Sequence, residues 1–120
     1  MKLAIVGSRV YPDLDRVRRY VRALPLDTVI VSGGAKGVDL EAELTARARG
    51  MTVEIYRVTS EDWRVYGKGA GMRRNSFIVA ACDQLVAFHD GTSKGTADSI
   101  AKARAAGKLR EVILPGDDEP

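Results

Sequence analysis

Short apolar runs alternate with helix-length segments along the chain. The runs are typical of buried strands and lie at residues 2–6, 28–31, 52–58, 84–88 and 111–114. Apolar residues at helical spacing between charged ones predict a first helix, which starts near Pro12-Asp13 and carries Leu14, Val17, Tyr20, Val21 and Leu24. Three further helices are predicted at residues 38–49, 72–81 and 96–106.

This strict alternation predicts an α/β protein. Parallel strands joined by right-handed crossovers place helices on both faces of one sheet. We therefore expect a three-layer α/β/α Rossmann-like sandwich around a five-stranded parallel sheet. With 120 residues the chain is expected to form one domain, residues 1–116, followed by an acidic tail at 117–120. Residues 59–71 hold the only Trp and three glycines, and they are predicted to form a long functional loop.

Composition narrows the chemistry. A single cysteine, Cys82, and a single histidine, His89, argue against a disulfide framework, a metal site and a Ser-His-Asp triad. No apolar run reaches the length of a membrane span. The first apolar run of the chain is too short for a signal peptide. We therefore expect a cytoplasmic protein without membrane contact and without a required cofactor.

Charge is distributed unevenly. The formal net charge is +3, but three of the 16 acidic residues lie in the last four positions. Residues 1–116 therefore carry 19 cationic against 13 acidic side chains, a formal charge of +6. Arginine supplies 13 of the cations, and its planar guanidinium suits phosphate recognition.

Three loops of unusual composition are expected at the carboxyl ends of the strands, where open parallel sheets bind ligands. Glycine lets backbone N–H groups approach a ligand closely, and a helix N-terminus favours an anion. The second and third loops, at residues 32–37 and 90–96, therefore resemble phosphate cradles, although neither is a standard nucleotide fingerprint. Their candidate binding residues are Gly7, Ser8 and Arg9; Ser32, Gly33, Gly34, Ala35 and Gly37; and Asp90, Gly91, Ser93, Lys94, Gly95 and Thr96.

Further candidates lie between these loops. Trp63 is expected to line a lid loop or stack on a base, and Lys68 to supply charge. Arg74 and Asn75 are candidates for contacting the sugar or the base. If the protein is an enzyme, the catalytic candidates are Asp39, Asp90, Asp98 and Arg74. Cys82 and His89 are expected to be structural.

A family resemblance rests on these motifs in this order. The chain resembles the small stand-alone SLOG proteins, often called YspA-like, in Gly7-Ser8-Arg9, Val31–Asp39, Asp62-Trp63 with Tyr66–Lys68, Gly71 with Arg74-Asn75, and Phe88–Thr96. These proteins are Rossmann-like relatives of DprA and of the LOG enzymes. The resemblance spans about residues 2–114.

The resemblance implies a nucleotide or nucleotide-derived ligand, such as an ADP-ribose-like molecule, bound by a sensor that forms a dimer or larger homo-oligomer. Two alternatives stay open. One is LOG-type hydrolysis of a nucleotide N-glycosidic bond, although Ser99 stands where the LOG enzymes have their glutamate. The other is binding of single-stranded DNA, as the DprA branch does.

Overall fold

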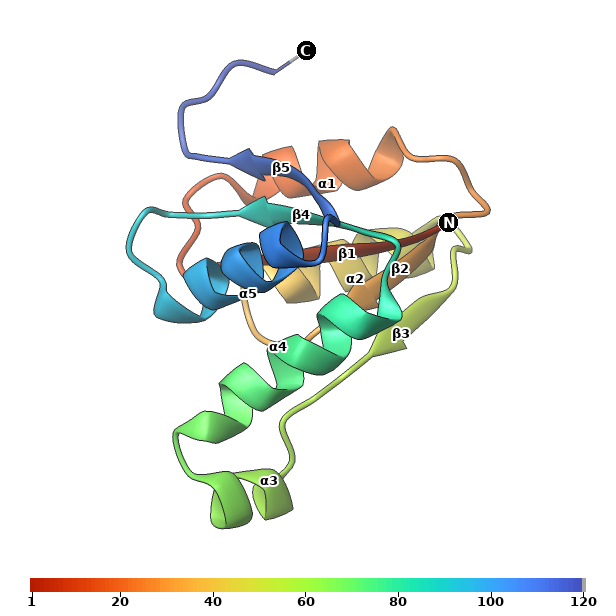
Figure 1. Ribbon diagram of the computed structural model, residues 1–120. Helices are drawn as coiled ribbons and strands as arrows, with labels where there is room; N and C mark the ends of the chain where they lie inside the picture. Colours follow the sequence, from red (N-terminus) through yellow and green to blue (C-terminus); the bar gives the residue numbers. More distant parts are fainter. Residues whose placement is uncertain (120) are drawn as a thin grey trace.

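The computed structural model describes residues 1–119 as an open parallel sheet between two pairs of helices (Figure 1). The strand order is β3-β2-β1-β4-β5, and every pairing is parallel. The strands are β1 (Lys2–Gly7), β2 (Val29–Ser32), β3 (Val53–Ile55), β4 (Gln84–Phe88) and β5 (Leu109–Ile113). The helices are α1 (Leu14–Arg22), α2 (Val38–Ala48), α3 (Ser60–Tyr66), α4 (Gly69–Ala81) and α5 (Lys94–Ala105). The predicted fold class is confirmed.

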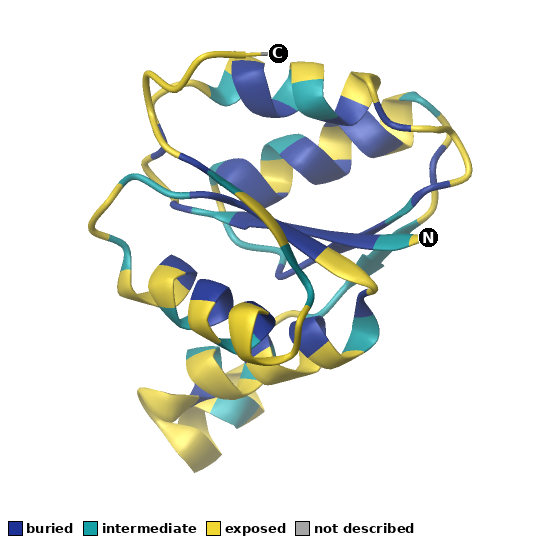
Figure 2. Cartoon of the chain, turned by 45° about the horizontal axis from the view of Figure 1, so that its top comes forward, coloured by how far each residue is buried: buried dark blue, intermediate teal, exposed yellow. Residues whose placement is uncertain are grey.

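The two sides of the sheet build two separate cores. Leu3 and Ile5 of β1 pack toward α1 and α2, whereas Ala4 and Val6 pack toward α4 and α5. The central strands are apolar on both faces, and this explains why they appear in the sequence as continuous runs without alternation. Figure 2 shows these strands as a buried layer between the two helix pairs.

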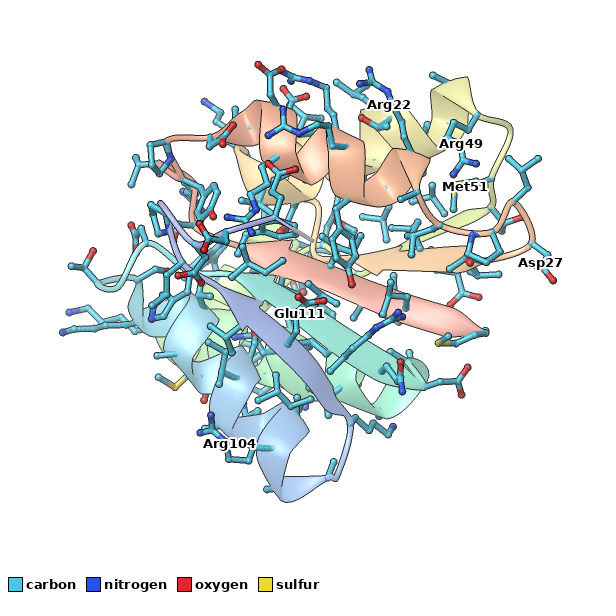
Figure 3. All side chains as sticks on the ribbon, turned by 90° about the horizontal axis from the view of Figure 1, so that it is seen from above. Arg22, Asp27, Arg49, Met51, Arg104 and Glu111 are labelled. Carbon is cyan, nitrogen blue, oxygen red and sulfur yellow. The ribbon has the colours of Figure 1, made fainter. Side chains whose placement is uncertain are left out.

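Side chains hold the ends of α1 in place. Asp13 precedes the helix, and its side chain accepts a hydrogen bond from the Arg16 N–H, as the predicted start near Pro12-Asp13 requires. At the other end, the Arg49 guanidinium donates to the carbonyl oxygens of Val21 and Leu24, at 2.7 and 2.9 Å. Figure 3 shows Arg49 beside Met51 at this end of the molecule.

The acidic segment after β5 folds back over α1. Arg16 donates hydrogen bonds to the backbone carbonyls of Asp117 and Asp118, and Arg19 pairs with Glu119. The predicted tail extends to Pro120, which lies outside the described residues. The carboxylate of Glu119 thus pairs with two arginines of α1, since its Oε1 also lies 3.9 Å from Arg16 Nε.

The prediction of a long loop at residues 59–71 is wrong. Residues 60–66 form α3, and α4 begins at Gly69. A capping box starts α3, because Thr59 and Asp62 each accept a hydrogen bond from the other's backbone N–H. The helix has no apolar stripe, since its residues are exposed or only partly buried (Figure 2), so hydrophobic periodicity does not reveal it. Gly69 and Gly71 enter α4 against their low helix propensity.

The β3 strand is also shorter than predicted. It ends at Ile55 and not at residue 58, so Tyr56 and Arg57 already belong to the loop region at the carboxyl edge of the sheet. Among residues 1–119, no helix combines the length and the apolar character needed to cross a membrane.

We predict that Gly37→Ala destabilises the fold and that Gly71→Ala does not. Gly37 has φ 79° and ψ −124°, and an added Cβ would lie 2.5 Å from the Arg9 carbonyl oxygen. We expect the free energy of unfolding to fall by about 3 kcal/mol from backbone strain and this contact. At Gly71, inside α4, a Cβ meets open space, so alanine should leave stability unchanged or raise it by up to ~1 kcal/mol. Urea unfolding of both variants checks this, and similar stability of the two would contradict it.

Candidate functional site

A cleft of about 390 Å³ opens where the strand order reverses, between the carboxyl ends of β1 and β4. Open α/β sheets bind ligands at this position because the loops of the two central strands diverge there. We name it the switch-point cleft. It is lined by Val6, Gly7, Ser8, Arg9, Val10, Ala35, Asp39, Arg74, Asn75, Ile78, Asp90, Thr92, Ser93, Gly95, Thr96 and Ser99.

A second hollow of about 230 Å³ adjoins this cleft. We name it the Trp63 hollow; its lining is Arg9, Gly33, Gly34, Ala35, Arg57, Val58, Trp63, Gly71 and Arg74. Arg9, Ala35 and Arg74 line both spaces. The exposed Arg9 and the half-buried Arg74 therefore stand at the shared rim, and Trp63 lies half-exposed beyond it.

Ser8 fastens the three predicted loops to one another. Its N–H donates to the carbonyl of Phe88, at 3.2 Å, and its own carbonyl accepts the N–H of Val38 at the start of α2. Its hydroxyl oxygen accepts the N–H of Asp90, at 3.2 Å. The buried Ser8 thus joins the end of β1 to α2 and to the β4–α5 loop, which explains how the loops keep the cleft open between them.

The glycine-rich loop after β2 uses its amides internally. The Gly34 N–H donates to the Ser32 hydroxyl oxygen, at 3.2 Å, and the Ala35 N–H donates to Oδ2 of Asp39, at 3.3 Å. Ser32 in turn donates to the buried carboxylate of Glu43, at 2.8 Å. The Asp39 carboxylate thus accepts a hydrogen bond from the Ala35 N–H, which belongs to a loop predicted to bind a phosphate.

Asp39 is a buried carboxylate in the wall of the switch-point cleft. Only 4% of its surface is exposed, and this burial raises its pKa to about 6. Hydrogen bonds from the Ala35 and Gly33 backbone and the positive charge of Arg74 act in the opposite direction, whereas the charge of Glu43 raises the pKa further. Asp39 therefore changes its protonation state close to neutral pH.

Arg74 is positioned by its neighbours. Its guanidinium donates Nη1–H to the Gly33 carbonyl, at 2.7 Å, and Nε–H to Oδ1 of Asn75, at 3.0 Å. A Cβ at position 33 would lie 2.6 Å from Arg74 Nη1, so a side chain there would displace the guanidinium from this position. The Asn75 amide nitrogen donates to Gly95 O and to Asp98, so its described hydrogen bonds hold α4 against α5.

The β4–α5 loop presents the first turn of α5 to the cleft. Ser93 is the N-cap residue, and its hydroxyl oxygen accepts the N–H of Thr96. Asp90 shapes the loop, because its Oδ1 accepts the N–H groups of Thr92 and Ser93, both at 2.9 Å. These two hydrogen bonds lower the pKa of Asp90 to about 2. The dipole of a helix N-terminus favours an anion, although the N–H groups of Thr92, Ser93 and Thr96 already donate within the loop.

The three predicted catalytic carboxylates differ in environment. Asp98 pairs with Lys102 at 2.8 Å and accepts from Asn75, so it serves the α4–α5 contact outside the cleft lining. Asp90 is held ionised by backbone donors within its own loop. Of the three, only Asp39 combines a place in the cleft wall with a pKa near neutrality. Acid–base chemistry in this cleft would therefore depend on Asp39.

The structure brings most of the predicted binding residues together. The exceptions are Ser32, Gly37, Lys68, Gly91 and Lys94, which line neither space. Arg57, which donates to Gly34 O at 2.9 Å, was missed because the third strand was predicted to extend over it. Ser99 lines the cleft from the second turn of α5, a position that follows from its helical spacing behind Ser93 and Thr96.

Fold and site together define an open Rossmann-like α/β protein with its cleft at the strand-order switch. No family model matches the chain, and neither does any curated protein. Among solved structures, DNA processing protein A (DprA) from Streptococcus pneumoniae has a TM-score of 0.79 and 25% identity, over 97% of this chain and 50% of that one. DprA from Helicobacter pylori has a TM-score of 0.70 and 24% identity, over 98% of this chain and 66% of that one, and a single-stranded DNA binding mode is described for it.

The likeness covers nearly the whole chain, which spans only half the length of the pneumococcal protein. The predicted relationship to DprA is thereby supported at the level of the fold. Membership of the stand-alone SLOG proteins stays a prediction.

We predict that the buried charge of Asp39 costs stability at neutral pH. Its pKa is about 6 in the folded chain against 3.8 as the reference, so between these values the unfolded chain loses its proton first. Stability is thus lost as the pH rises through this window, by about 3 kcal/mol relative to Asp39→Asn. Urea unfolding of both proteins at pH 4 and pH 7.5 measures the change. A difference between the two proteins that does not vary with pH would contradict the assignment.

Proposed function

We propose that the switch-point cleft binds the phosphate of a nucleotide or a nucleotide-derived small molecule. One observation carries this proposal: the first turn of α5 and the guanidinium groups of Arg9 and Arg74 line the same cleft at the strand-order switch. Backbone donors at a helix N-terminus and paired arginines are both groups that recognise phosphate.

The size and polarity of the two spaces support a small organic phosphate. The cleft of about 390 Å³ lies within the range of small-molecule sites, ~300–1,000 Å³. The adjoining Trp63 hollow offers a half-exposed indole beyond the two arginines. A phosphate at α5 would leave room for a base or a second ligand group to stack on Trp63.

We predict that nucleotides raise the melting temperature of the wild-type protein. A panel of ribonucleoside mono- and diphosphates, NAD, ADP-ribose and cyclic nucleotides is suitable for a thermal-shift screen followed by calorimetry. A ligand at 100 times its Kd adds about 2.7 kcal/mol to the free energy of unfolding. Arg9→Ala should weaken binding about tenfold or more, because it removes a charge-assisted contact.

The matched control is Arg47→Ala, which removes an exposed arginine from the last turn of α2 outside both spaces. This variant should bind as the wild type does. If no compound in the panel shifts the melting temperature, the proposal is wrong.

Single-stranded DNA is the second candidate. It is favoured by the DprA neighbours and by the row of Arg9, Arg74, Arg57 and Trp63 along the two adjoining spaces. Three arginines can follow successive phosphates while an exposed indole stacks on one base.

If the chain binds DNA, Trp63→Ala should reduce affinity for an oligothymidylate about tenfold, since stacking on one base contributes ~1–3 kcal/mol. Affinity should also fall linearly with salt on logarithmic axes. Fluorescence anisotropy measures both effects. Val65→Ala, which removes another exposed apolar side chain of α3, is the control and should change little. Equal effects of the two substitutions, or affinity independent of salt, would contradict DNA binding at this surface.

A further inference from the structure

The two walls of the switch-point cleft differ in their charged groups. The wall formed by α5 and Arg9 carries a guanidinium together with the carboxylate of Asp90, whose Oδ1 already accepts the N–H groups of Thr92 and Ser93. On the wall formed by α2 and its preceding loop, the amides of Gly34 and Ala35 already donate within the chain. That wall presents the carboxylate of Asp39, which is a hydrogen-bond acceptor when ionised. A phosphate needs donors, whereas a hydroxyl group can satisfy an acceptor.

Asp39 is held in a fixed orientation. Its Oδ2 accepts the Ala35 N–H at 3.3 Å, and the Gly33 backbone also donates toward this carboxylate. The side chain is nine-tenths or more buried, yet it lines the cleft, so a ligand in the cleft can reach it. The charged groups that act on it are Arg74 from α4, with Arg9 beyond it, and Glu43 one turn further along α2.

We infer that Asp39 is a specificity-determining residue that accepts a hydrogen bond from a sugar hydroxyl, so that the cleft selects ribonucleotides with free ribose hydroxyls. This inference rests on the proposed binding of a nucleotide-derived ligand and adds the class of sugar. A buried acceptor that a ligand leaves unpaired costs binding energy, and sites built around such a group therefore discriminate strongly against the analogue without the hydroxyl.

The same inference separates the two candidate ligand classes. A nucleotide inside a DNA strand has no 2′-hydroxyl, and its 3′-oxygen is part of a phosphodiester, so it has no sugar hydroxyl to donate. A free ribonucleotide has both hydroxyls. Asp39 therefore favours a small ribonucleotide-type ligand over a DNA strand in this cleft, independently of the arginines, which suit both.

The test compares the affinities of the four ribonucleoside 5′-monophosphates with those of their 2′-deoxy and 2′,3′-dideoxy counterparts, by calorimetry at pH 7.5. We expect the wild type to bind the ribonucleotide about tenfold or more tightly than the dideoxy analogue. If the 2′-deoxy compound already binds more weakly than the ribonucleotide, the contact is with the 2′-hydroxyl. If only the dideoxy compound binds more weakly, the contact is with the 3′-hydroxyl. Equal affinity for all three sugars overturns the inference but leaves phosphate binding intact, whereas the proposed function itself is overturned if neither these compounds nor any member of the thermal-shift panel binds.

Substitutions separate direct contact from a structural role. Asp39→Asn keeps an acceptor for the Ala35 N–H but loses the charge, so the ratio of ribo to dideoxy affinity should fall severalfold, and Asp39→Ala should bring it to about one. Glu43→Gln is the matched control, because Glu43 lies on the same helix, is equally buried at 4% exposure and stands outside the cleft lining. It should keep the wild-type ratio. If Asp39→Asn and Asp39→Ala keep the wild-type ratio of ribo to dideoxy affinity and only lower both affinities equally, the inference is overturned.

Discussion

The hydrogen bonds of Ser8 hold the functional edge of the molecule together. Backbone and side chain of this one buried residue reach the end of β4, the start of α2 and the β4–α5 loop. The arrangement is available only because β1 is central and pairs with β2 on one side and β4 on the other. This arrangement positions both Asp39 and the first turn of α5. The cleft between them is therefore a consequence of sheet topology together with the hydrogen bonds of Ser8.

The glycine-rich loop after β2 uses backbone N–H groups in hydrogen bonds within the chain, and this limits which groups of that wall can bind a ligand. An amide that points at Asp39 or Ser32 has no capacity left for a ligand anion. The opposite wall, where α5 begins, carries the exposed Arg9. The buried carboxylate of Asp39 on α2 opposes the stability of the fold at neutral pH, because burial raises its pKa. Arg74, held by Gly33 and Asn75, is the cation that moderates this cost.

The likeness to DprA fits this division between scaffold and site. Two DprA structures share the fold over nearly the whole of this chain at about one quarter identity. A shared fold positions loops at the same sheet edge, but the ligand is chosen by the side chains on those loops. The exposed α3 stands apart from both cores (Figures 1 and 2), and its Trp63 lines the hollow together with Arg9 and Arg74.

The sequence by itself determined the sheet, the order of its elements and the edge at which the site lies. Central strands are buried on both faces and turns need glycine, so both leave local patterns that are readable without tertiary contacts. The helix α3 could not be found from periodicity, since it has no buried face, although Thr59 and Asp62 mark its start. Only the tertiary structure decided the roles within the site: that Asn75 holds helices together, that Asp90 serves its own loop and that Asp39 faces the cleft. These roles depend on distances between residues far apart in the chain, which hydrophobic patterning does not encode.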